Sequence, residues 1–422
     1  MKHSIIILLS AVVLAIGINS CQDNEENLND ASAPVVVNRF YPTSGGVGTE
    51  ILITGKNFST NPKEIKVTVG GRELKVLKSD MNNIMAIVPA MLGNGLINVQ
   101  IGSHEPVSTI EEFQYVFTAN VSTLAGSGEA GYADGIGTDA VFHFNDSPDN
   151  WRRGSICVDS KGNIYVGDVM NFCLRKITPD GTVTTFAGQA ETEGTSDGSG
   201  SNARFRGFYG METDSEDNIY LTDVFQWTIR KVTPEGNVTT LGSTDNEPWS
   251  ISVDKRNGDI YYTKKDGGIW KWVPDGVDMQ VTASGSAGIA IDDYGNIYAC
   301  DVPTNTIKRY AADTWEENLV IGNGQLGSQD GNFLDASFYW PSGLKISSTG
   351  DLYVACEGHN IRRVDMQNNF VYTISGTGTA GFVNGQGTGA SFNQPQDLAV
   401  DKNGNIYVFD KNNNAVRKII YQ

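Results

Sequence analysis

From residue 120 onward the chain repeats one short segment six times, and this repetition constrains the fold more than any other feature. Each copy holds a Tyr within an apolar run and most end in Asp, as in GNIYVGD at 162–168 and GNIYVFD at 404–410. An apolar strand precedes each copy, and most copies are followed by a strand of the Ile-Arg-Lys type and several by a Thr/Val-rich strand. Four strands per repeat, present six times, predict a six-bladed β-propeller.

The repeat consensus reads Pro-x-x-(apolar)-x-Val-Asp-x-x-Gly-Asn-Ile-Tyr-Val-x-Asp and continues into Ile-Arg-Lys-Ile. This pattern resembles the NHL repeat family, and the resemblance covers residues 120–422. The last repeat ends at VRKIIYQ without a fourth strand, whereas the segment VSTLAG at 121–126 has the sequence of one. We therefore expect strand 121–126 to close the sixth blade, so that the ring has no open edge.

Residues 34–118 show a different pattern of short β-branched strands that end at Gly or Pro, which is typical of a small β-sandwich. The segments Tyr41-Pro42-x-Ser44-Gly45-Gly46, Ile53-x-Gly55-x-Asn57-Phe58 and Phe113-x-Tyr115 resemble the IPT/TIG family of immunoglobulin-like domains. In surface lipoproteins such a domain implies a spacer. The expected fold is all-β: an immunoglobulin-like (IPT/TIG) sandwich followed by a six-bladed NHL-type β-propeller.

Residues 1–20 have the form of an export signal, because Lys2 precedes a short apolar run from Ile5 to Ile18. The run is too short for an ordinary spanning helix. The end Ile18-Asn19-Ser20-Cys21 resembles the lipobox of bacterial lipoproteins, which implies lipidation of Cys21 and anchoring to the membrane by lipid only. Residues 21–33 form an acidic tether that resembles the surface-export signal of Bacteroidetes lipoproteins. We expect an outer membrane lipoprotein that faces the cell exterior.

Charge and metal-ligand content exclude several classes of function. The chain has 31 Lys+Arg against 49 Asp+Glu and a formal charge of −18, which argues against nucleic acid as a partner. Histidines and cysteines show no zinc spacing, and the Asp-Gly connections offer too few oxygen ligands for calcium. We therefore expect no metal and no cofactor. The cysteines of the propeller are expected to be buried free thiols: Cys157, Cys173, Cys300 and Cys356.

Residues that break the repeat pattern are the best site candidates, since recurring ones serve the architecture. At the expected mouth of the channel, aromatic residues gather on blades one to three, beside two arginines in an insertion of the first blade. The ligand-binding candidates are Phe172, Tyr209, Phe225, Trp227, Trp249, Arg152, Arg153 and, on blade five, Trp340. Such a surface suits sugar rings and equally suits a protein partner. The alternative for each aromatic is packing between blades.

Catalysis has less support in the sequence. The recurring Asp168, Asp223, Asp301 and Asp410 are expected to bond to the next turn. Asp397 and Glu357 form the best carboxylate pair for hydrolysis, a weak one because the separation that decides such chemistry is not given by the sequence.

The expected function is non-catalytic binding of a polysaccharide or oligosaccharide, with outer-membrane uptake proteins as further partners. For Bacteroidetes-like lipoproteins of this layout the resemblance implies an accessory role in glycan capture. A propeller hydrolase or lyase and a surface protein-interaction scaffold remain as alternatives.

Overall fold

The computed structural model describes residues 29–30, 32–89, 92–145, 152–274 and 276–421. The expected signal, Cys21 and most of the tether lie outside this part of the chain. The chain divides into two compact units, Met1–Val116 and Phe117–Gln422. Within the described ranges, none of the helices is long and apolar enough to cross a membrane.

The first unit is built from eight strands in the order β1-β3-β6-β5-β4-β7-β8-β2. Alternate residues of its strands point inward, so that Ile51, Ile53 and Val67 are fully buried. Gly55 permits a close approach of two segments, because a Cβ there would lie 2.0 Å from the carbonyl oxygen of Val36. The strands are β1 (Val36–Tyr41), β2 (Ser44–Gly45), β3 (Glu50–Lys56), β4 (Ile65–Val69), β5 (Arg72–Ser79), β6 (Asn83–Ile87), β7 (Gly95–Ile101) and β8 (Val107–Tyr115).

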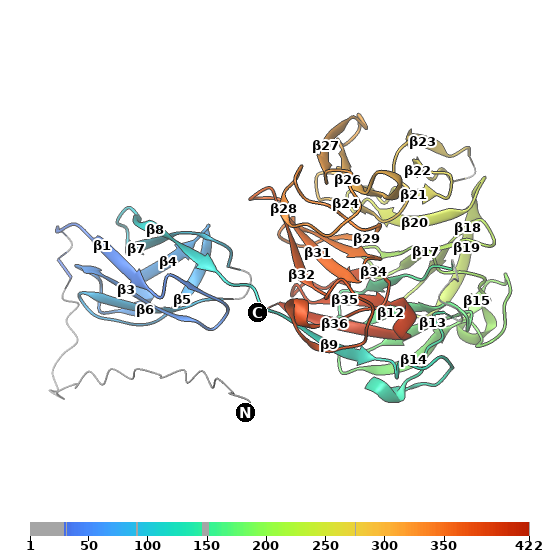
Figure 1. Ribbon diagram of the computed structural model, residues 1–422, viewed down its shortest axis with the longest axis horizontal. Helices are drawn as coiled ribbons and strands as arrows, with labels where there is room; N and C mark the ends of the chain where they lie inside the picture. The colour runs from blue at the N-terminus through green and yellow to red at the C-terminus, as the bar shows by residue number, and fades with distance from the viewer. Residues whose placement is uncertain (1–28, 31, 90–91, 146–151, 275, 422) are drawn as a thin grey trace, which may run out of the picture. The chain divides into compact units, whose positions relative to one another are not determined.

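The second unit is a six-bladed β-propeller, as predicted (Figure 1). The innermost strand of each blade comes first in its repeat. In blade order these inner strands are β11 (Ile156–Val158), β16 (Met211–Thr213), β20 (Pro248–Val253), β24 (Ile289–Ile291), β29 (Pro341–Ile346) and β34 (Pro395–Val400).

The remaining strands of each blade follow outward in antiparallel order. They are β12 (Ile164–Asp168), β13 (Cys173–Ile177), β14 (Thr182–Ala187) and β10 (Gly135–Ile136) in blade one; β17 (Ile219–Asp223), β18 (Thr228–Val232), β19 (Asn237–Ser243) and β15 (Gly198–Ser199) in blade two; β21 (Ile260–Lys264), β22 (Ile269–Lys271) and β23 (Met279–Thr282) in blade three; β25 (Ile297–Asp301), β26 (Thr306–Tyr310) and β27 (Glu317–Ile321) in blade four; β30 (Leu352–Cys356), β31 (Asn360–Asp365), β32 (Phe370–Ser375) and β28 (Gly331–Asn332) in blade five; and β35 (Ile406–Asp410), β36 (Ala415–Tyr421), β9 (Ala119–Ala125) and β33 (Gly385–Gln386) in blade six. Short 3₁₀ turns are η1 (Pro62–Glu64), η2 (Gly137–Asp139), η3 (Gly200–Asn202), η4 (Val302–Thr304), η5 (Gly387–Gly389) and η6 (Lys411–Asn413).

The ring closes through β9, the strand that begins the propeller unit. β9 pairs antiparallel with β36, with Val121 opposite Ile419 and Thr123 opposite Arg417. In Figure 1 the teal β9 lies beside the red β36. The first and last strands of the propeller thus share one blade, which leaves blade six with a complete set of strands.

Three recurring aspartates, Asp168, Asp223 and Asp410, are held by fully buried arginines, which are Arg175, Arg230 and Arg417. The fourth, Asp301, binds Lys308 instead, and the fully buried Arg362 lies in blade five, which lacks this aspartate. Arg175 bonds Asp168 at 2.6 Å, and Arg417 bonds Asp410 at 2.8 Å. Asp168, Asp223 and Asp410 each also accept a backbone N–H from the end of the preceding Gly-rich connection, as Asp168 does from His143. The Asp-Gly and Asn-Gly pairs add a further oxygen to the arginines, which is a carboxylate of Asp134 at 2.7 Å for Arg175 and the amide oxygen of Asn384 at 2.7 Å for Arg417. The aspartates and the Asp-Gly turns therefore hold neighbouring parts of the chain together.

The expected inter-blade aromatics are confirmed, because Phe142, Phe205, Phe338 and Phe392 are all fully buried. Each ring lies under one of the buried guanidinium groups, at 5.1–5.3 Å from the ring centre. The four propeller cysteines are buried free thiols, as predicted. Among the described residues no group of three or more His, Cys, Asp or Glu side chains is arranged to hold a metal ion.

Candidate functional site

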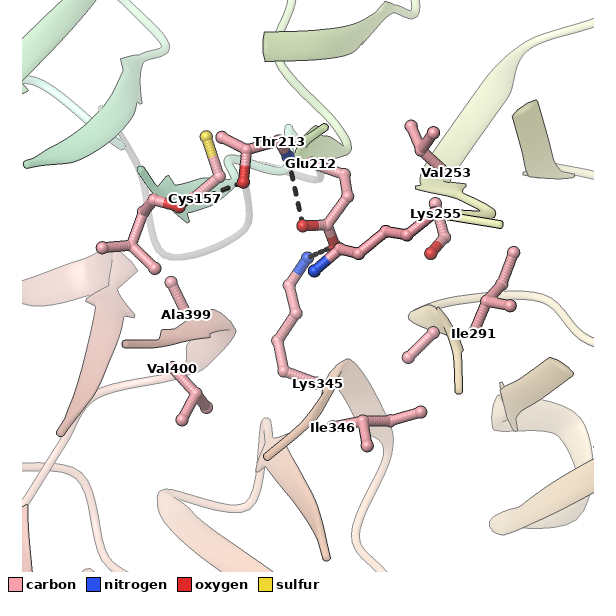
Figure 2. A pocket seen from close by; sticks show the side chains of 13 residues that line it. Cys157, Glu212, Thr213, Val253, Lys255, Ile291, Lys345, Ile346, Ala399 and Val400 are labelled. Atoms are coloured by element: carbon pink, nitrogen blue, oxygen red, sulfur yellow. Dashed lines mark hydrogen bonds and ion pairs between the residues drawn. The ribbon is translucent and has the colours of Figure 1, made fainter. Parts of the chain in front are cut away.

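The six inner strands surround a central channel, and each contributes one side chain to the same layer of it. That layer contains Cys157, Glu212, Ser252, Ala290, Lys345 and Ala399, which line a cavity of about 110 Å³ (Figure 2). Alternation along a strand puts every second residue on the channel side, which explains why these positions correspond between blades. Only two of the six side chains in this layer are charged.

Glu212 and Lys345 form an ion pair of 2.7 Å across this layer. Glu212 lies on blade two and Lys345 on blade five, three places apart in the ring. Lys345 Nζ also donates to the carbonyl oxygen of Met211 at 3.2 Å. Burial by itself would raise the pKa of Glu212, but the Lys345 ammonium and then that of Lys255 outweigh it and lower this pKa. The pair spans the channel in this layer.

At the end of the channel where the inner strands begin, six of the eight predicted ligand-binding residues form one continuous contact chain. The Arg152 guanidinium lies 5.7 Å from the ring centre of Phe172 and 4.5 Å from that of Phe225. The ring centres of Phe225 and Tyr209 lie 5.9 Å apart, and those of Tyr209 and Trp249 lie 6.3 Å apart in an edge-on arrangement. The chain of contacts ends at Arg153, which lies 5.2 Å from the ring centre of Trp249. We call these six residues the mouth cluster.

The mouth cluster narrows the channel. Tyr209 is only 6% exposed and packs between Phe225 and Trp249, so its ring stabilises the cluster more than it offers surface to a ligand. Burial raises the pKa of its hydroxyl. The cavity between Arg153, Tyr209 and Trp249 measures about 20 Å³, which is room for one water molecule.

Two polar atoms that line this small cavity have no partner among the described residues. They are Nε1 of Trp249, a donor, and Oε1 of Gln396, an acceptor on a side chain that is 6% exposed. A single water, or one hydroxyl of a ligand, can satisfy both atoms. The mouth therefore retains unused hydrogen-bonding capacity.

Trp227 and Trp340 lie outside this contact chain and are each 45% exposed. Both have left-handed backbone conformations, with φ of 56° and 48°. The residues equivalent to Trp227 are all left-handed as well, so the turn itself imposes this conformation, although Asn tolerates it better than a bulky residue. They are Phe172, Asn305, His359 and Asn414 in blades one, four, five and six. The backbone of Trp315 is left-handed too, but its ring packs on that of Tyr261, with 5.5 Å between the ring centres. Trp340 also packs on a neighbouring ring, with 5.5 Å between its centre and that of Tyr339, yet Trp340 and Trp227 both remain 45% exposed.

The structure gives the candidate carboxylates Asp397 and Glu357 separate partners. Asp397 is partly buried and accepts from the Ser155 hydroxyl and the Ile156 backbone N–H, and the loss of solvent around it raises its pKa. Glu357 forms an ion pair with Arg153 at 2.8 Å. Within the described part of the chain no hydrogen bond joins the two acids, and each binds a residue of blade one, so these contacts give the proposed acid–base pair no support.

Glu212, Lys345 and Gln396 were not among the residues that the sequence singled out. The signal that could have found the ion pair is a charge at an inner-strand position where four blades have Cys, Ser or Ala. Aligned repeats place blades two and five on opposite sides of a six-membered ring, so opposite charges there predict a contact.

Comparison with known proteins supports the assignment of both domains. Residues 34–115 match the IPT/TIG domain family, and residues 392–419 match the NHL repeat family. Both resemblances are confirmed. The chain is 24% identical over 315 residues to Protein SUPPRESSOR OF QUENCHING 1, chloroplastic, of Arabidopsis thaliana. That match covers 63% of this chain and 30% of the relative, so the chain spans less than a third of the relative's length.

Two solved structures share the fold across both domains. A protein of unknown function from Bacteroides thetaiotaomicron superposes with a TM-score of 0.68 at 21% identity, covering 93% of this chain and 100% of that one. An auxiliary nutrient binding protein from Bacteroides ovatus has a TM-score of 0.56 at 20% identity, covering 93% and 99%. At such identities the likeness establishes the fold alone.

Proposed function

We propose that this chain is a cell-surface lipoprotein that captures polysaccharide or oligosaccharide without catalysis, at the mouth of its propeller. The observation that carries the proposal is the presence of Trp227 and Trp340, two half-exposed indoles in a left-handed backbone conformation. Because the turn that holds Trp227 is left-handed in five blades, the exposure of the two indoles supports a binding role more than their backbone conformation does. Exposed indole faces can stack on the C–H faces of sugar rings.

The mouth cluster supplies the second element of the proposed site. Its packed rings and arginines provide a firm base, which limits the entropy lost when a ligand binds. Beside it, the buried atoms Trp249 Nε1 and Gln396 Oε1 border a cavity with room for one water, through which they can contribute a donor and an acceptor to a bound sugar. The name of the structural neighbour from Bacteroides ovatus, an auxiliary nutrient binding protein, is in line with capture as opposed to turnover.

The enzymatic alternative is less well supported. A hydrolase or lyase needs an acid and a base placed on either side of the bond, whereas Asp397 and Glu357 are engaged with Ser155 and Arg153. A surface scaffold that binds protein through the same indoles is the third possibility. The electrophoresis with polysaccharides described next distinguishes such a scaffold from a glycan-binding protein.

The direct test is affinity gel electrophoresis of the purified chain in gels that contain a panel of neutral and acidic polysaccharides. We expect at least one polysaccharide to retard the wild type, and the Trp227→Ala and Trp340→Ala variants to migrate faster in it. Tyr294→Ala is the matched control, because Tyr294 is 79% exposed and belongs to the opposite end of the channel. Product release would favour the enzyme, and a full panel without retardation would refute glycan capture.

Attachment and location form a separate part of the proposal. Metabolic labelling with a palmitate analogue should mark the wild type and not Cys21→Ser. Protease added to intact cells should remove the labelled protein if it faces the exterior. Co-purification with outer-membrane uptake proteins would support the expected partners, whereas an unlabelled protein would refute the lipid anchor.

A further inference from the structure

A second and much larger cavity opens at the other end of the inner strands. Its volume is about 900 Å³, within the range of small-molecule binding sites. The turns that follow the inner strands of all six blades line it, with Asp159, Asp214, Lys255, Asp292, Ser347 and Asp401 among them. Val158, Thr213, Lys255, Ile291, Ile346 and Val400 line both this cavity and the channel cavity, so the two are continuous. We call the larger cavity the lower bowl.

Most carboxylates around the lower bowl are used within their own turns. Asp159 accepts the backbone N–H groups of Lys161 and Asn163. Asp214, Asp292 and Asp401 accept N–H groups two and four residues further on in the same way. These aspartates shape the rim, and their negative charge opposes a polyanionic ligand.

Asp293 is different, because its carboxylate makes no hydrogen bond or ion pair with any residue of the described ranges, although it lines the bowl. The next residue, Tyr294, is 79% exposed and also lines the bowl. Arg256 Nη1 donates to the carbonyl oxygen of Tyr294 at 2.6 Å and so ties the turn of blade three to that of blade four. A carboxylate beside an open aromatic face is a suitable environment for an ammonium group.

Lys255 supplies the opposite charge in the same cavity. Its side chain points toward Glu212 (Figure 2), and its ammonium contributes to lowering the pKa of that acid. Glu212 is already bonded to Lys345, and Lys255 makes no hydrogen bond or ion pair with the described residues. At the inner end of the bowl, Glu212, Lys255 and Lys345 therefore carry two ammonium groups and one carboxylate between them. The Glu212–Lys345 pair spans the channel, and the cavity in that layer opens into the bowl, so we expect a solute to enter from the bowl.

We propose that the lower bowl binds a small zwitterionic solute, an amino acid or short peptide with free termini. Its carboxylate would lie at the Lys255 ammonium, and its α-ammonium would lie against Asp293 and the face of Tyr294. Adjacent blades present these two groups in one cavity, and the bond from Arg256 to Tyr294 holds their turns together. A neutral saccharide uses neither charge, and a polyanion meets the acidic rim. This site is separate from the mouth and does not depend on glycan capture there.

Isothermal titration of the full chain tests the proposal with four probes: alanine, trialanine, N-acetyl-trialanine and trialanine amide. We expect a free zwitterion to bind, and blocking either terminus of the tripeptide to weaken binding at least tenfold. Binding of alanine as tightly as trialanine would assign the site to amino acids, and tighter binding of trialanine would assign it to peptides. Lys255→Met should weaken binding of free trialanine at least tenfold, so that trialanine no longer binds more tightly than trialanine amide. Asp293→Asn should make trialanine bind no more tightly than N-acetyl-trialanine.

Lys161→Met is the matched control, because Lys161 is an exposed lysine in the equivalent turn of blade one and does not line the bowl. This variant should bind as the wild type does. The proposal is overturned if neither alanine nor trialanine binds, if the blocked tripeptides bind equally well, or if Lys255→Met binds like the control. Loss of glycan retardation with intact zwitterion binding would refute the function proposed for the mouth and leave this site standing.

Discussion

Glu212 of blade two and Lys345 of blade five meet at 2.7 Å across the central channel of the propeller. The two inner strands that carry them lie three places apart in the ring, so the pair links opposite sides of the molecule. It also separates the mouth cluster from the lower bowl. The two ends of the channel can therefore differ in what they bind.

The first prediction concerns the stability that this pair contributes. Glu212→Gln should lower the free energy of unfolding by about 3 kcal/mol, because it leaves the Lys345 ammonium without its carboxylate. The double variant Glu212→Gln with Lys345→Met should recover most of that loss, since no unpaired charge remains. Urea denaturation of the wild type, both single variants and the double variant gives the coupling energy. Additive effects of the two changes would contradict a direct interaction.

The pH dependence of stability provides a second prediction. The pKa of Glu212 lies below its ordinary value of 4.5, because the ammonium groups of Lys345 and Lys255 outweigh the effect of burial. Its contribution is therefore complete above about pH 4.5 and is lost as the pH falls through the lowered pKa. Below that point the wild type should lose stability more steeply than Glu212→Gln. Parallel curves of unfolding free energy against pH would show that Glu212 has no such role.

The left-handed conformation of Trp227 leads to a third prediction. Trp227→Ala and Trp227→Gly lose the same indole contacts, but only Ala keeps the cost of a Cβ at a φ of 56°. The Gly variant should therefore be the more stable of the two by about 1 kcal/mol. At a residue with ordinary helical or extended φ the order is reversed. Thermal unfolding of the pair is sufficient, and a more stable Ala variant would contradict the assigned backbone conformation.

Closure of the ring by β9 gives a fourth prediction. Thr123 lies opposite Arg417 in β9, a strand between β36 and β33, so the ring of a proline at this position disturbs the pairing of β9 inside the blade. Thr123→Pro should destabilise the propeller by about 3 kcal/mol or more. Thr123→Val keeps the backbone donor and should change stability by less than about 1 kcal/mol. Similar stabilities for the two variants would show that β9 adds little to the propeller.

The repeats made the fold predictable because each carries the same strands and turns in the same order. The aromatic residues of the mouth were also predictable, since Phe172, Trp227 and Trp249 break that order. The buried arginines were harder to interpret: Arg175 and Arg417 recur within an Ile-Arg-Lys pattern typical of surface strands, yet both are fully buried. Besides a nearby aspartate, Arg175 binds the carboxylate of Asp134, 41 residues away, and Arg417 binds the amide oxygen of Asn384, 33 residues away.

The candidate acids show the corresponding limit. Asp397 and Glu357 both depart from the repeat, which is the only property that the sequence could use. Their partners, Ser155 and Arg153, lie in blade one and become neighbours only when the ring closes. The same holds for the unpartnered atoms of Trp249 and Gln396, which depend on side-chain packing at the mouth.

The central claim is that exposed indoles at the mouth bind saccharide, and calorimetry on one double variant tests it most directly. Wild type and the variant Trp227→Gly with Trp340→Gly are titrated with an oligosaccharide of the polysaccharide that retards the wild type, and Tyr294→Ala serves as the control. We predict that the double variant binds at least tenfold more weakly while Tyr294→Ala binds like the wild type. Unchanged affinity in the folded double variant would contradict the account.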